Sequence, residues 1–299
     1  MQLKMRKYII LILLYLFNFG YSQDGCWFSS LFKDFDKLTP EYKAFFNANS
    51  DAMYAYEQLY KAGRTGLKQN KKALEAFITA KNNAKLKELG FTDQLLAKVN
   101  GYNPASYDEI LTDLDKLGDF LTQNNIKLEN FQSTIGILVG NNANYRQGVH
   151  WIIQDIGKET AFANKTLTLE VSINNARETL SSIDLVCNAC ANGRNINIEY
   201  KSGPGSIKSE TIKKQFIERD LFNANSLNEI QWRMKNTNLT KEKLVEWLIE
   251  HKSSLNNPKA RKLFEDFGKQ KQANLSIDDT DDLIDFFKKN DEWYNLIFK

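Results

Sequence analysis

Side chains that bind transition metals or act as nucleophiles are scarce in this sequence. Its 299 residues include 2 histidines and 3 cysteines, an odd number that cannot all pair in disulfides. Cys187 and Cys190 have Cys-x-x-Cys spacing, but no second pair of zinc ligands lies near them. A zinc site is therefore disfavoured, whereas a disulfide and two free thiols both stay open. A Cys/His hydrolase using His150 with either cysteine has no supporting motif and ranks last among the functions considered.

The chain also lacks a large excess of basic residues. It has 40 Lys and Arg against 37 Asp and Glu. Residues 1–22, which we interpret as a cleaved export signal, hold three basic residues and no acidic ones. Removing them leaves 37 residues of each sign. Overall charge is thus no argument for nucleic-acid binding, and any phosphate contact has to come from a local basic patch.

The export signal is predicted from three features of residues 1–22. A basic start with Lys4 and Arg6 is followed by an apolar run from Tyr8 to Phe19, and then by small residues such as Ser22. The apolar run is short for a membrane span, so we expect a secreted or exported protein without a stable span after cleavage. An uncleaved anchor is the alternative.

Helical patterns dominate both ends of the chain. Thr39-Pro40-Glu41 predicts a helix start, and Ser106 with Glu109 predicts another. We expect a helical region over residues 23–143, a mixed domain over 144–236 and a helical extension over 237–299. Within the mixed domain, Ser226-Leu227-Asn228-Glu229 resembles a capping box and predicts a helix that continues through Trp232 and Met234.

A predicted β-hairpin between residues 183 and 201 carries the most informative side chains. Two apolar-alternating runs flank a turn that contains Gly193. Strand side chains alternate between faces, so Glu199 and Lys201 point one way and Tyr200 points the other. If the apolar faces of the two strands match, Asp184 joins Glu199 and Lys201. Two carboxylates and one ammonium group then meet on a small patch.

That combination suits a divalent cation and a phosphate. Mg²⁺ prefers oxygen ligands and is usually held by one or two carboxylates together with water and substrate phosphate. A lysine beside it can orient or activate the attacking water and offset charge on the phosphoryl group. The hairpin therefore predicts a Mg²⁺ or Mn²⁺ site that acts on phosphate esters.

The same residues resemble a known signature. Asp184 followed by Glu199-Tyr200-Lys201 is similar to the D…ExK motif of PD-(D/E)xK, or restriction-endonuclease-like, nucleases. The segments YRQGVHWIIQDIG and IEYKSGPGSIKSETIKKQFIERDLFN resemble nuclease domains of bacterial polymorphic toxins. The resemblance covers mainly residues 145–235. It implies an α+β fold, in which a small mixed sheet flanked by helices follows the helical N-terminal region and precedes the helical tail.

The resemblance also implies a function and residue roles. The expected activity is Mg²⁺-dependent hydrolysis of phosphodiester bonds, in DNA more than RNA, by a secreted toxin with an immunity protein as partner. Asp184 and Glu199 would hold the metal with the carbonyl oxygen of Tyr200, and Lys201 would orient or activate water. Gln215, on the helix that follows, would orient the substrate or the lysine.

The stretch that ends at Arg219 is the most basic segment beside this site. From Lys201 it holds five basic and two acidic residues, and we expect it to bind the phosphate backbone. The residues expected to do so are Lys208, Lys213, Lys214 and Arg219. Three further candidates are Glu170, as an added metal ligand or a solvent-facing residue; Asp155, as the acidic residue of the first helix; and His150, as an acid or base or a structural residue.

A non-catalytic secreted binding or adaptor protein is the main alternative. In that case the hairpin is only a polar-edged part of a sheet, and Asp184 and Glu199 need not meet. Carboxylates more than about 6 Å apart cannot share one ion, given metal–oxygen bonds near 2.1 Å. The separation of these two side chains therefore distinguishes the two functions.

Overall fold

The computed structural model describes residues 39–49, 51–64, 70–176 and 180–299. The predicted export signal lies outside these ranges. Within them, no helix is both long enough and apolar enough to cross a membrane. The chain forms two compact units that divide between Leu74 and Glu75.

The first unit contains helices α3 (Pro40–Ala48) and α4 (Ala52–Lys61). The predicted start of α3 is confirmed, because the side chain of Thr39 accepts a hydrogen bond from the backbone of Tyr42 and Pro40 occupies the first turn. Aromatic residues on one side of each helix form its core, with Phe46 and Tyr56 in edge-to-face contact. Helix α5 (Lys71–Asn82) begins at the end of this unit.

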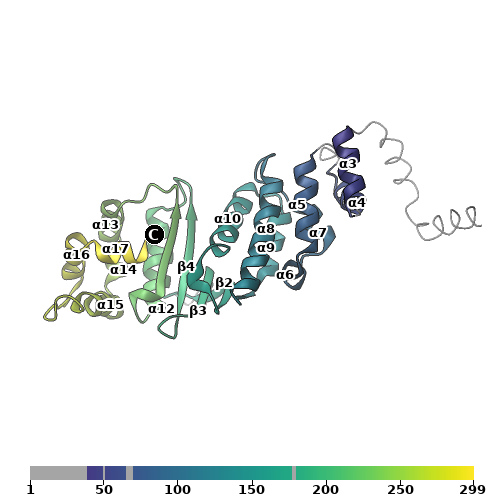
Figure 1. The fold of residues 1–299 in the computed structure, drawn as a ribbon. Helices are drawn as coiled ribbons and strands as arrows, with labels where there is room; N and C mark the ends of the chain where they lie inside the picture. Colours follow the sequence, from purple (N-terminus) through teal and green to yellow (C-terminus); the bar gives the residue numbers. More distant parts are fainter. Residues whose placement is uncertain (1–38, 50, 65–69, 177–179) are drawn as a thin grey trace, which may run out of the picture. The chain divides into compact units, whose positions relative to one another are not determined.

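The second unit is α+β, as predicted, and holds one sheet. Strands β1 (Lys127–Glu129), β2 (Thr166–Asn174), β3 (Leu180–Ala191), β4 (Arg194–Ser202) and β5 (Ile230–Lys235) lie side by side in sequence order. Strand β3 is antiparallel to both β2 and β4, whereas β1 is parallel to β2 and β5 is parallel to β4. The sheet is therefore mixed, with helices on both faces (Figure 1).

Helices from the N-terminal side cover one face of this sheet. They are α6 (Ala84–Glu88), α7 (Asp93–Lys98), α8 (Ser106–Gln123), α9 (Phe131–Val139) and α10 (Ala143–Ile156). Helices α9 and α10 make the main contacts with the strands, and α6, α7 and α8 pack behind them. Helix α10 contacts β4 through Trp151, whose ring lies edge-to-face on Tyr200 with 5.1 Å between centroids. This contact makes the Tyr200 face of β4 the inner face toward α10.

The opposite face packs on the segment after β4 and on the C-terminal helices. A short helix α11 (Ser209–Thr211) continues into a nine-residue π-helix η3 (Ile212–Asp220) and ends as α12 (Leu221–Asn223). The 3-10 turn η4 (Leu227–Glu229) precedes β5. The helices that follow β5 are α13 (Lys241–Glu250), the short α14 (Lys252–Leu255), α15 (Pro258–Lys269), α16 (Thr280–Lys289) and α17 (Glu292–Ile297). Their core is aromatic, with Phe216 and Phe298 against Trp232.

The helix predicted over Trp232 and Met234 is wrong, because these residues lie in β5. Ile230, Trp232 and Met234 recur every second residue, which is the period of a strand. The cap-like Ser226 and Glu229 belong only to the short turn η4. The parallel pairing of β5 with β4 then places Trp232 beside Glu199 on one face of the sheet.

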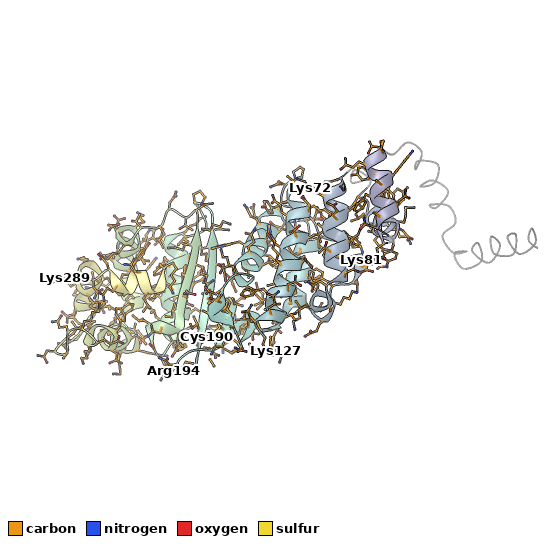
Figure 2. The ribbon with its side chains drawn as sticks, in the orientation of Figure 1. Lys72, Lys81, Lys127, Cys190, Arg194 and Lys289 are labelled. Atoms are coloured by element: carbon orange, nitrogen blue, oxygen red, sulfur yellow. A yellow bond between two sulfur atoms is a disulfide. The ribbon has the colours of Figure 1, made fainter. Side chains whose placement is uncertain are left out.

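Helices α6 to α9, which precede residue 144, and the helices after residue 236 share one compact unit with the sheet. The domain boundaries expected at those points stay predictions. Figure 2 shows the side chains on this framework, with Cys190 and Arg194 at the turn end of the β3–β4 hairpin.

Candidate functional site

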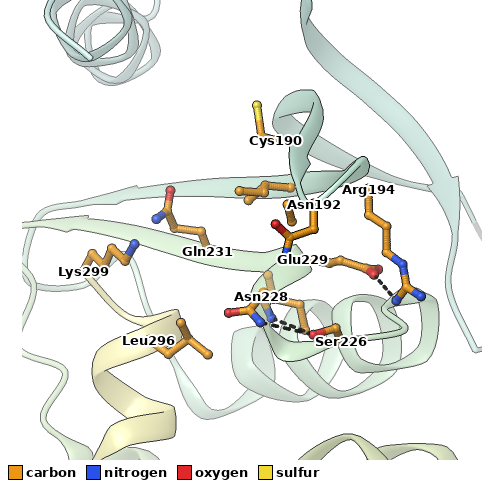
Figure 3. A pocket seen from close by; sticks show the side chains of 12 residues that line it. Cys190, Asn192, Arg194, Ser226, Asn228, Glu229, Gln231, Leu296 and Lys299 are labelled. Carbon is orange, nitrogen blue, oxygen red and sulfur yellow. Dashed lines mark hydrogen bonds and ion pairs between the residues drawn. The ribbon is translucent and has the colours of Figure 1, made fainter. Parts of the chain in front are cut away.

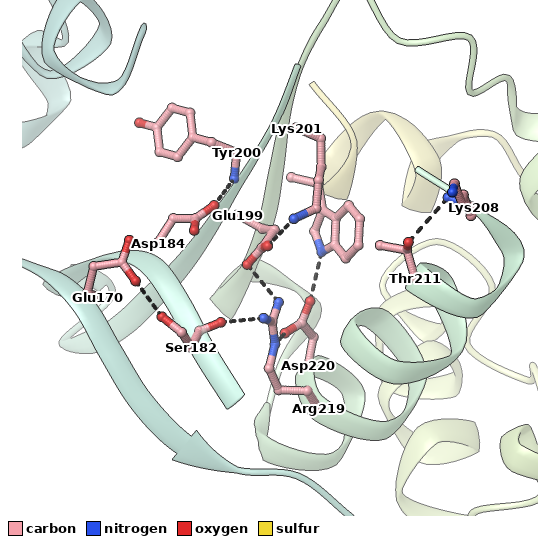
Figure 4. A network of polar contacts seen from close by, with 11 residues as sticks. Glu170, Ser182, Asp184, Glu199, Tyr200, Lys201, Lys208, Thr211, Arg219 and Asp220 are labelled. Carbon is pink, nitrogen blue, oxygen red and sulfur yellow. Dashed lines mark hydrogen bonds and ion pairs between the residues drawn. The ribbon is translucent and has the colours of Figure 1, made fainter. Parts of the chain in front are cut away.

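The sheet splits between β3 and β4, and the predicted site lies where the split begins (Figure 4). Pairing of these strands reaches Leu185 opposite Ile198. Beyond that point β3 continues with β2 as far as Leu180, and β4 continues with β5 as far as Ser202. We call this opening the fork. Asp184 and Glu199 are the first residues beyond the pair Leu185–Ile198, so the backbone places them together at the base of the fork.

Asp184 takes the place of a missing backbone partner. Its Oδ2 accepts a hydrogen bond from the backbone N–H of Tyr200 at 2.7 Å. The N–H and C=O of one strand residue point toward the same neighbouring strand. The carbonyl oxygen of Tyr200 therefore also points into the fork, where a third metal ligand was predicted. A short acidic side chain at this position lets the two strands separate without leaving that N–H unpaired.

Glu199 is buried between two cationic side chains. It is 3% exposed, its Oε1 pairs with the ammonium of Lys201, and its Oε2 accepts from Arg219 at 2.9 Å. Lys201 also lies 5.7 Å from the ring centroid of Trp232. The structure thus brings Glu199 and Lys201 together as the alternation of the strand predicts. It also engages both oxygens of Glu199.

Arg219 is not on the basic surface where the sequence analysis placed it. Its side chain is fully buried, donating to Asp220 at 2.6 Å, to the carbonyl oxygen of Ser182 at 2.5 Å, and to Glu199. Burial alone lowers the pKa of this guanidinium, yet Asp220 and Glu199 raise it above its usual value, so it stays charged. Arg219 therefore joins the two arms of the fork and holds Glu199 in place instead of meeting phosphate.

Asp220 and Trp232 complete this buried network. Asp220 Oδ2 accepts from the indole N–H of Trp232 at 2.7 Å, so Asp220 links the π-helix to β5. Neither residue was among the predicted site residues. Asp220 directly follows Arg219 in the sequence. The structure shows that the π-helix η3 buries both side chains.

The carboxyl group of Asp184 is unusually hard to ionise. Burial raises its pKa to about 7, and the negative charge of Glu199 adds to the shift, while Lys201 and the Tyr200 N–H oppose it. A group whose ionised form is disfavoured by lost water and a nearby carboxylate gains from a cation placed beside it. This observation is independent of the sequence motif and marks the fork as a favourable position for a metal ion.

We expect Asp184→Asn to stabilise the metal-free protein, and more so at high pH. The folded pKa of about 7 exceeds the usual 3.8, so folded Asp184 keeps a proton that the unfolded chain releases, and wild-type stability falls as pH rises between these values. Asp184→Asn has no carboxyl group at this position, so its stability does not fall for this reason as the pH rises. Its advantage in free energy of unfolding should grow by about 2 kcal/mol from about pH 5 to pH 8. Urea titrations in EDTA measure it.

A matched control is Asp285→Asn, which removes an exposed carboxylate from α16. It should show no such dependence on pH. A constant difference between wild type and Asp184→Asn across this range would contradict the raised pKa.

Gln215 lies in the π-helix, and its Oε1 is buried. Within the described ranges that oxygen accepts no hydrogen bond. Buried polar atoms without partners are uncommon and mark positions of strain or of function. Gln215 does not line the cavity described below. Its predicted role in orienting substrate or Lys201 stays a prediction.

The three additional candidates lie in different places. Glu170 lines the cavity, has a left-handed backbone (φ 50°), and accepts from the Ser182 hydroxyl at 2.7 Å. Asp155 is buried on the α10 face, where it accepts from the Tyr200 hydroxyl at 2.8 Å and pairs with Arg233. These contacts make Asp155 a support for β4.

His150 is 3% exposed, and its Nε2 lies 2.8 Å from Asp113 on α8. It is not among the residues that line the cavity. A structural role for His150, through its contact with Asp113, therefore accounts for its position. Its predicted role as an acid or base stays a prediction.

The predicted phosphate-binding lysines lie on the segment after β4. Lys208 and Lys214 are exposed and Lys213 is partly buried, and Lys214 pairs with Glu210 at 3.2 Å. Because Arg219 is buried and Lys214 pairs with Glu210, the surface of this segment is less basic than its five basic residues suggest. The three lysines can still contact phosphate, because an exposed ion pair exchanges partners at little cost.

A cavity of about 670 Å³ opens beside the fork. It receives Asp184 and Glu170 from the split strands, Tyr200 and Lys201 from β4, and an apolar and aromatic wall from α9 and α10. The full lining is Ser133, Ile137, Asn144, Tyr145, Gly148, Val149, Trp151, Ile152, Glu170, Asp184, Tyr200, Lys201, Ser202 and Ser206. The α10 wall was not predicted as part of the site, because apolar and aromatic residues on a helix are equally typical of a buried core.

Comparisons with protein-family models, with curated proteins and with solved structures found no match to this chain. The chemistry of the fork therefore has to be judged from its own geometry.

A metal ion at the fork would have an all-oxygen ligand set. In the part of the chain that the structure describes, no three His, Cys, Asp or Glu side chains gather in a way that could hold a metal. The donors that are present are the carboxylates of Asp184 and Glu199 and the carbonyl oxygen of Tyr200. Mg²⁺ commonly uses only one or two carboxylates and takes its other ligands from water and phosphate. The residues fit that ion and do not fit zinc.

Cys187 and Cys190 are joined in a disulfide. It spans a bulge in β3, where pairing with β4 stops after Cys187 and resumes at Ala191. A second cavity of about 600 Å³ lies at this turn end of the hairpin, beside Cys190 and the Arg194–Glu229 ion pair (Figure 3). The disulfide leaves no thiol here for the Cys/His hydrolase considered above, and His150 pairs with Asp113 instead.

Proposed function

We propose that this chain is a Mg²⁺- or Mn²⁺-dependent nuclease that hydrolyses phosphodiester bonds in DNA. One observation carries the proposal: Asp184 and Glu199 are the first residues beyond the β3–β4 pairing, Lys201 pairs with Glu199, and Asp184 and Lys201 line a cavity at the fork. The mixed sheet flanked by helices agrees with a restriction-endonuclease-like arrangement, which we propose on the D…ExK spacing.

The charges around the fork support this chemistry. Asp184, Glu199 and Asp220 supply three carboxylates, and Lys201 and Arg219 supply two cations. Once Asp184 ionises, the group carries one net negative charge. A divalent cation reverses that sign and thereby prepares the site for a phosphate diester. When bound, such a cation offsets charge on the phosphate and acidifies water.

The protein side chains then have distinct roles. Asp184 uses Oδ2 for Tyr200 N–H and keeps Oδ1 for a ligand. Glu199 stays oriented by Arg219 through Oε2, so Oε1 becomes available when Lys201 moves toward the substrate. Lys201 would donate a hydrogen bond to a non-bridging oxygen of the phosphate and orient the water that attacks its phosphorus atom, from which the ester oxygen leaves. Arg219 acts as a positioning residue, because its guanidinium touches Glu199 and not the phosphate.

Cleavage of plasmid DNA tests the proposal. We expect the purified chain to nick or linearise plasmid in Mg²⁺ or Mn²⁺ and to lose this activity in EDTA. Asp184→Asn should lower the rate at least about 100-fold, although the same variant is expected to be more stable than wild type. Loss of activity with a gain of stability cannot come from unfolding.

Asp285→Asn again serves as the control and should cleave like wild type. Cleavage that persists in EDTA, or equal cleavage by Asp184→Asn, would rule out this site. Export through residues 1–22, action as a toxin and neutralisation by an immunity protein belong to the same proposal. Growth arrest on expression of wild type, absent with Asp184→Asn, is the expected cellular result.

A non-catalytic binding or adaptor role is the second candidate. It is favoured by the engagement of both Glu199 oxygens by Lys201 and Arg219. A site locked in this way would bind nucleic acid without cleaving it. Isothermal titration with Mg²⁺ separates the two, since a locked site shows no heat that depends on Asp184.

A further inference from the structure

The cavity beside the fork has a wall that phosphate chemistry does not need. Tyr145, Val149 and Ile152 of α10 and Ile137 of α9 face the same space as Asp184 and Lys201. Apolar and aromatic side chains gain nothing from a charged sugar–phosphate chain. Its volume of about 670 Å³ is in the range of roughly 300–1,000 Å³ that holds one drug-sized molecule. A single nucleotide fits that range, whereas a duplex does not.

The aromatic residues of this wall are placed for stacking. Tyr145 lies on the first turn of α10 and is 66% exposed, which is unusual for so large an apolar ring. Trp151 lies six residues further along α10. Its ring is in edge-to-face contact with Tyr200, and the ammonium of Lys235 lies 5.8 Å from its centroid. Aromatic rings interleaved with lysines are the pattern that binds single strands, because bases stack on rings while phosphates meet the cations.

Access to this wall requires an unstacked base. In a duplex the base faces are covered by their neighbours, so only groove edges and phosphates reach a protein. A base that has left the stack can enter a pocket and lie on an aromatic ring. The distance from the wall to the fork is short, since Asp184, Lys201 and Tyr145 line one cavity.

We propose that this cavity binds one unstacked nucleobase beside the scissile phosphate, and that single-stranded DNA, including the unpaired stretches that supercoiling opens in a plasmid, is the substrate class. The inference rests on the proposed function only for the position of the phosphate. Tyr145 supplies the stacking face and Lys235 and Lys201 supply charge. Gly148 lines the cavity and borders open space, because a Cβ added there meets no atom within 4 Å.

Binding in EDTA tests the inference without relying on cleavage. Fluorescence anisotropy compares a labelled oligothymidine with a duplex of the same length. We expect wild type to bind the single strand at least about tenfold more tightly. Tyr145→Ala should weaken single-strand binding about tenfold, because one lost stacking contact is worth roughly 5- to 100-fold, while Tyr145→Phe should bind like wild type. Gly148→Leu should fill the cavity and weaken single-strand binding similarly, with an unchanged melting temperature.

Phe222→Ala is the matched control. Phe222 is 39% exposed on α12 and does not line the cavity, so its loss should change nothing. Equal binding of single strand and duplex, or full binding by Tyr145→Ala, would overturn the inference. Single-strand preference in a protein that never cleaves would instead overturn the nuclease and leave the nucleobase cavity standing.

Discussion

Replacing Lys201 by methionine is expected to lower the rate of Mg²⁺-dependent DNA cleavage about 1,000-fold while the protein stays folded. The ammonium is the only group at the fork that can both meet a phosphate oxygen and orient the attacking water, among the residues that the structure describes. Positioned proton-transfer and charge-stabilising groups are each worth roughly 100- to 10,000-fold. Methionine keeps an unbranched apolar side chain at this position and removes the ammonium that lies 5.7 Å from the ring centroid of Trp232.

Folding should survive this change because Glu199 keeps a cationic partner. Arg219 donates to Glu199 Oε2 at 2.9 Å, and the substitution does not remove this donor. We therefore expect kcat to fall and KM to change by no more than a few-fold. Single-turnover cleavage of a labelled oligonucleotide separates the two quantities, and circular dichroism checks the fold.

Lys262→Met is the matched control. Lys262 is exposed on α15 and pairs with Asp266, so removing its charge should leave cleavage unchanged. Cleavage by Lys201→Met within tenfold of wild type would show that the lysine has no part in the chemistry. The non-catalytic alternative would then gain support.

Arg219→Leu is expected to destabilise the second unit by about 3–5 kcal/mol, the cost of removing one partner from a buried ion-pair network. The change leaves the buried carboxylates of Glu199 and Asp220 without their shared cation, and it leaves the carbonyl oxygen of Ser182 without its donor. For a unit of this size the loss should lower the melting temperature by roughly 10 °C. Thermal unfolding followed by circular dichroism measures it.

Arg194→Leu makes the same substitution at an exposed ion pair. The side chain of Arg194 is 59% exposed where it meets Glu229, so its removal should cost less than about 1 kcal/mol. The comparison also decides the role of Arg219. If Arg219→Leu stayed fully stable and lost only affinity for DNA, the buried arginine would have to reach phosphate after all, as the sequence analysis expected.

Periodicity predicted the local elements well wherever it was unambiguous. Strict alternation in residues 166–173 and 195–201 produced strands, and Thr39-Pro40 produced a helix start. The failure at Ile230, Trp232 and Met234 arose because a cap-like motif was given more weight than a two-residue period. A short apolar run fits a helix or a strand until its neighbours are known.

At the site, the sequence predicted partners within one strand better than partners across elements. Glu199 and Lys201 lie two residues apart in β4, and the alternation of a strand brings them to one face whatever the fold. The place of Asp184 depended on matching two strands, and the hairpin register supports it. The burial of Arg219 depends on the π-helix and on the split in the sheet, and neither feature can be predicted from residue types.

The order of amino acids by itself determined a hairpin with two acidic residues and a lysine, a basic segment after it, and helices on either side. These follow from local periods, which act over a few neighbouring residues. Only the tertiary structure decided that the sheet splits at Asp184, that Arg219 is enclosed, and that α10 adds an aromatic wall to the cavity. Such features depend on contacts between segments that are far apart in the chain, and they are determined by side-chain packing and by the pairing of buried charges.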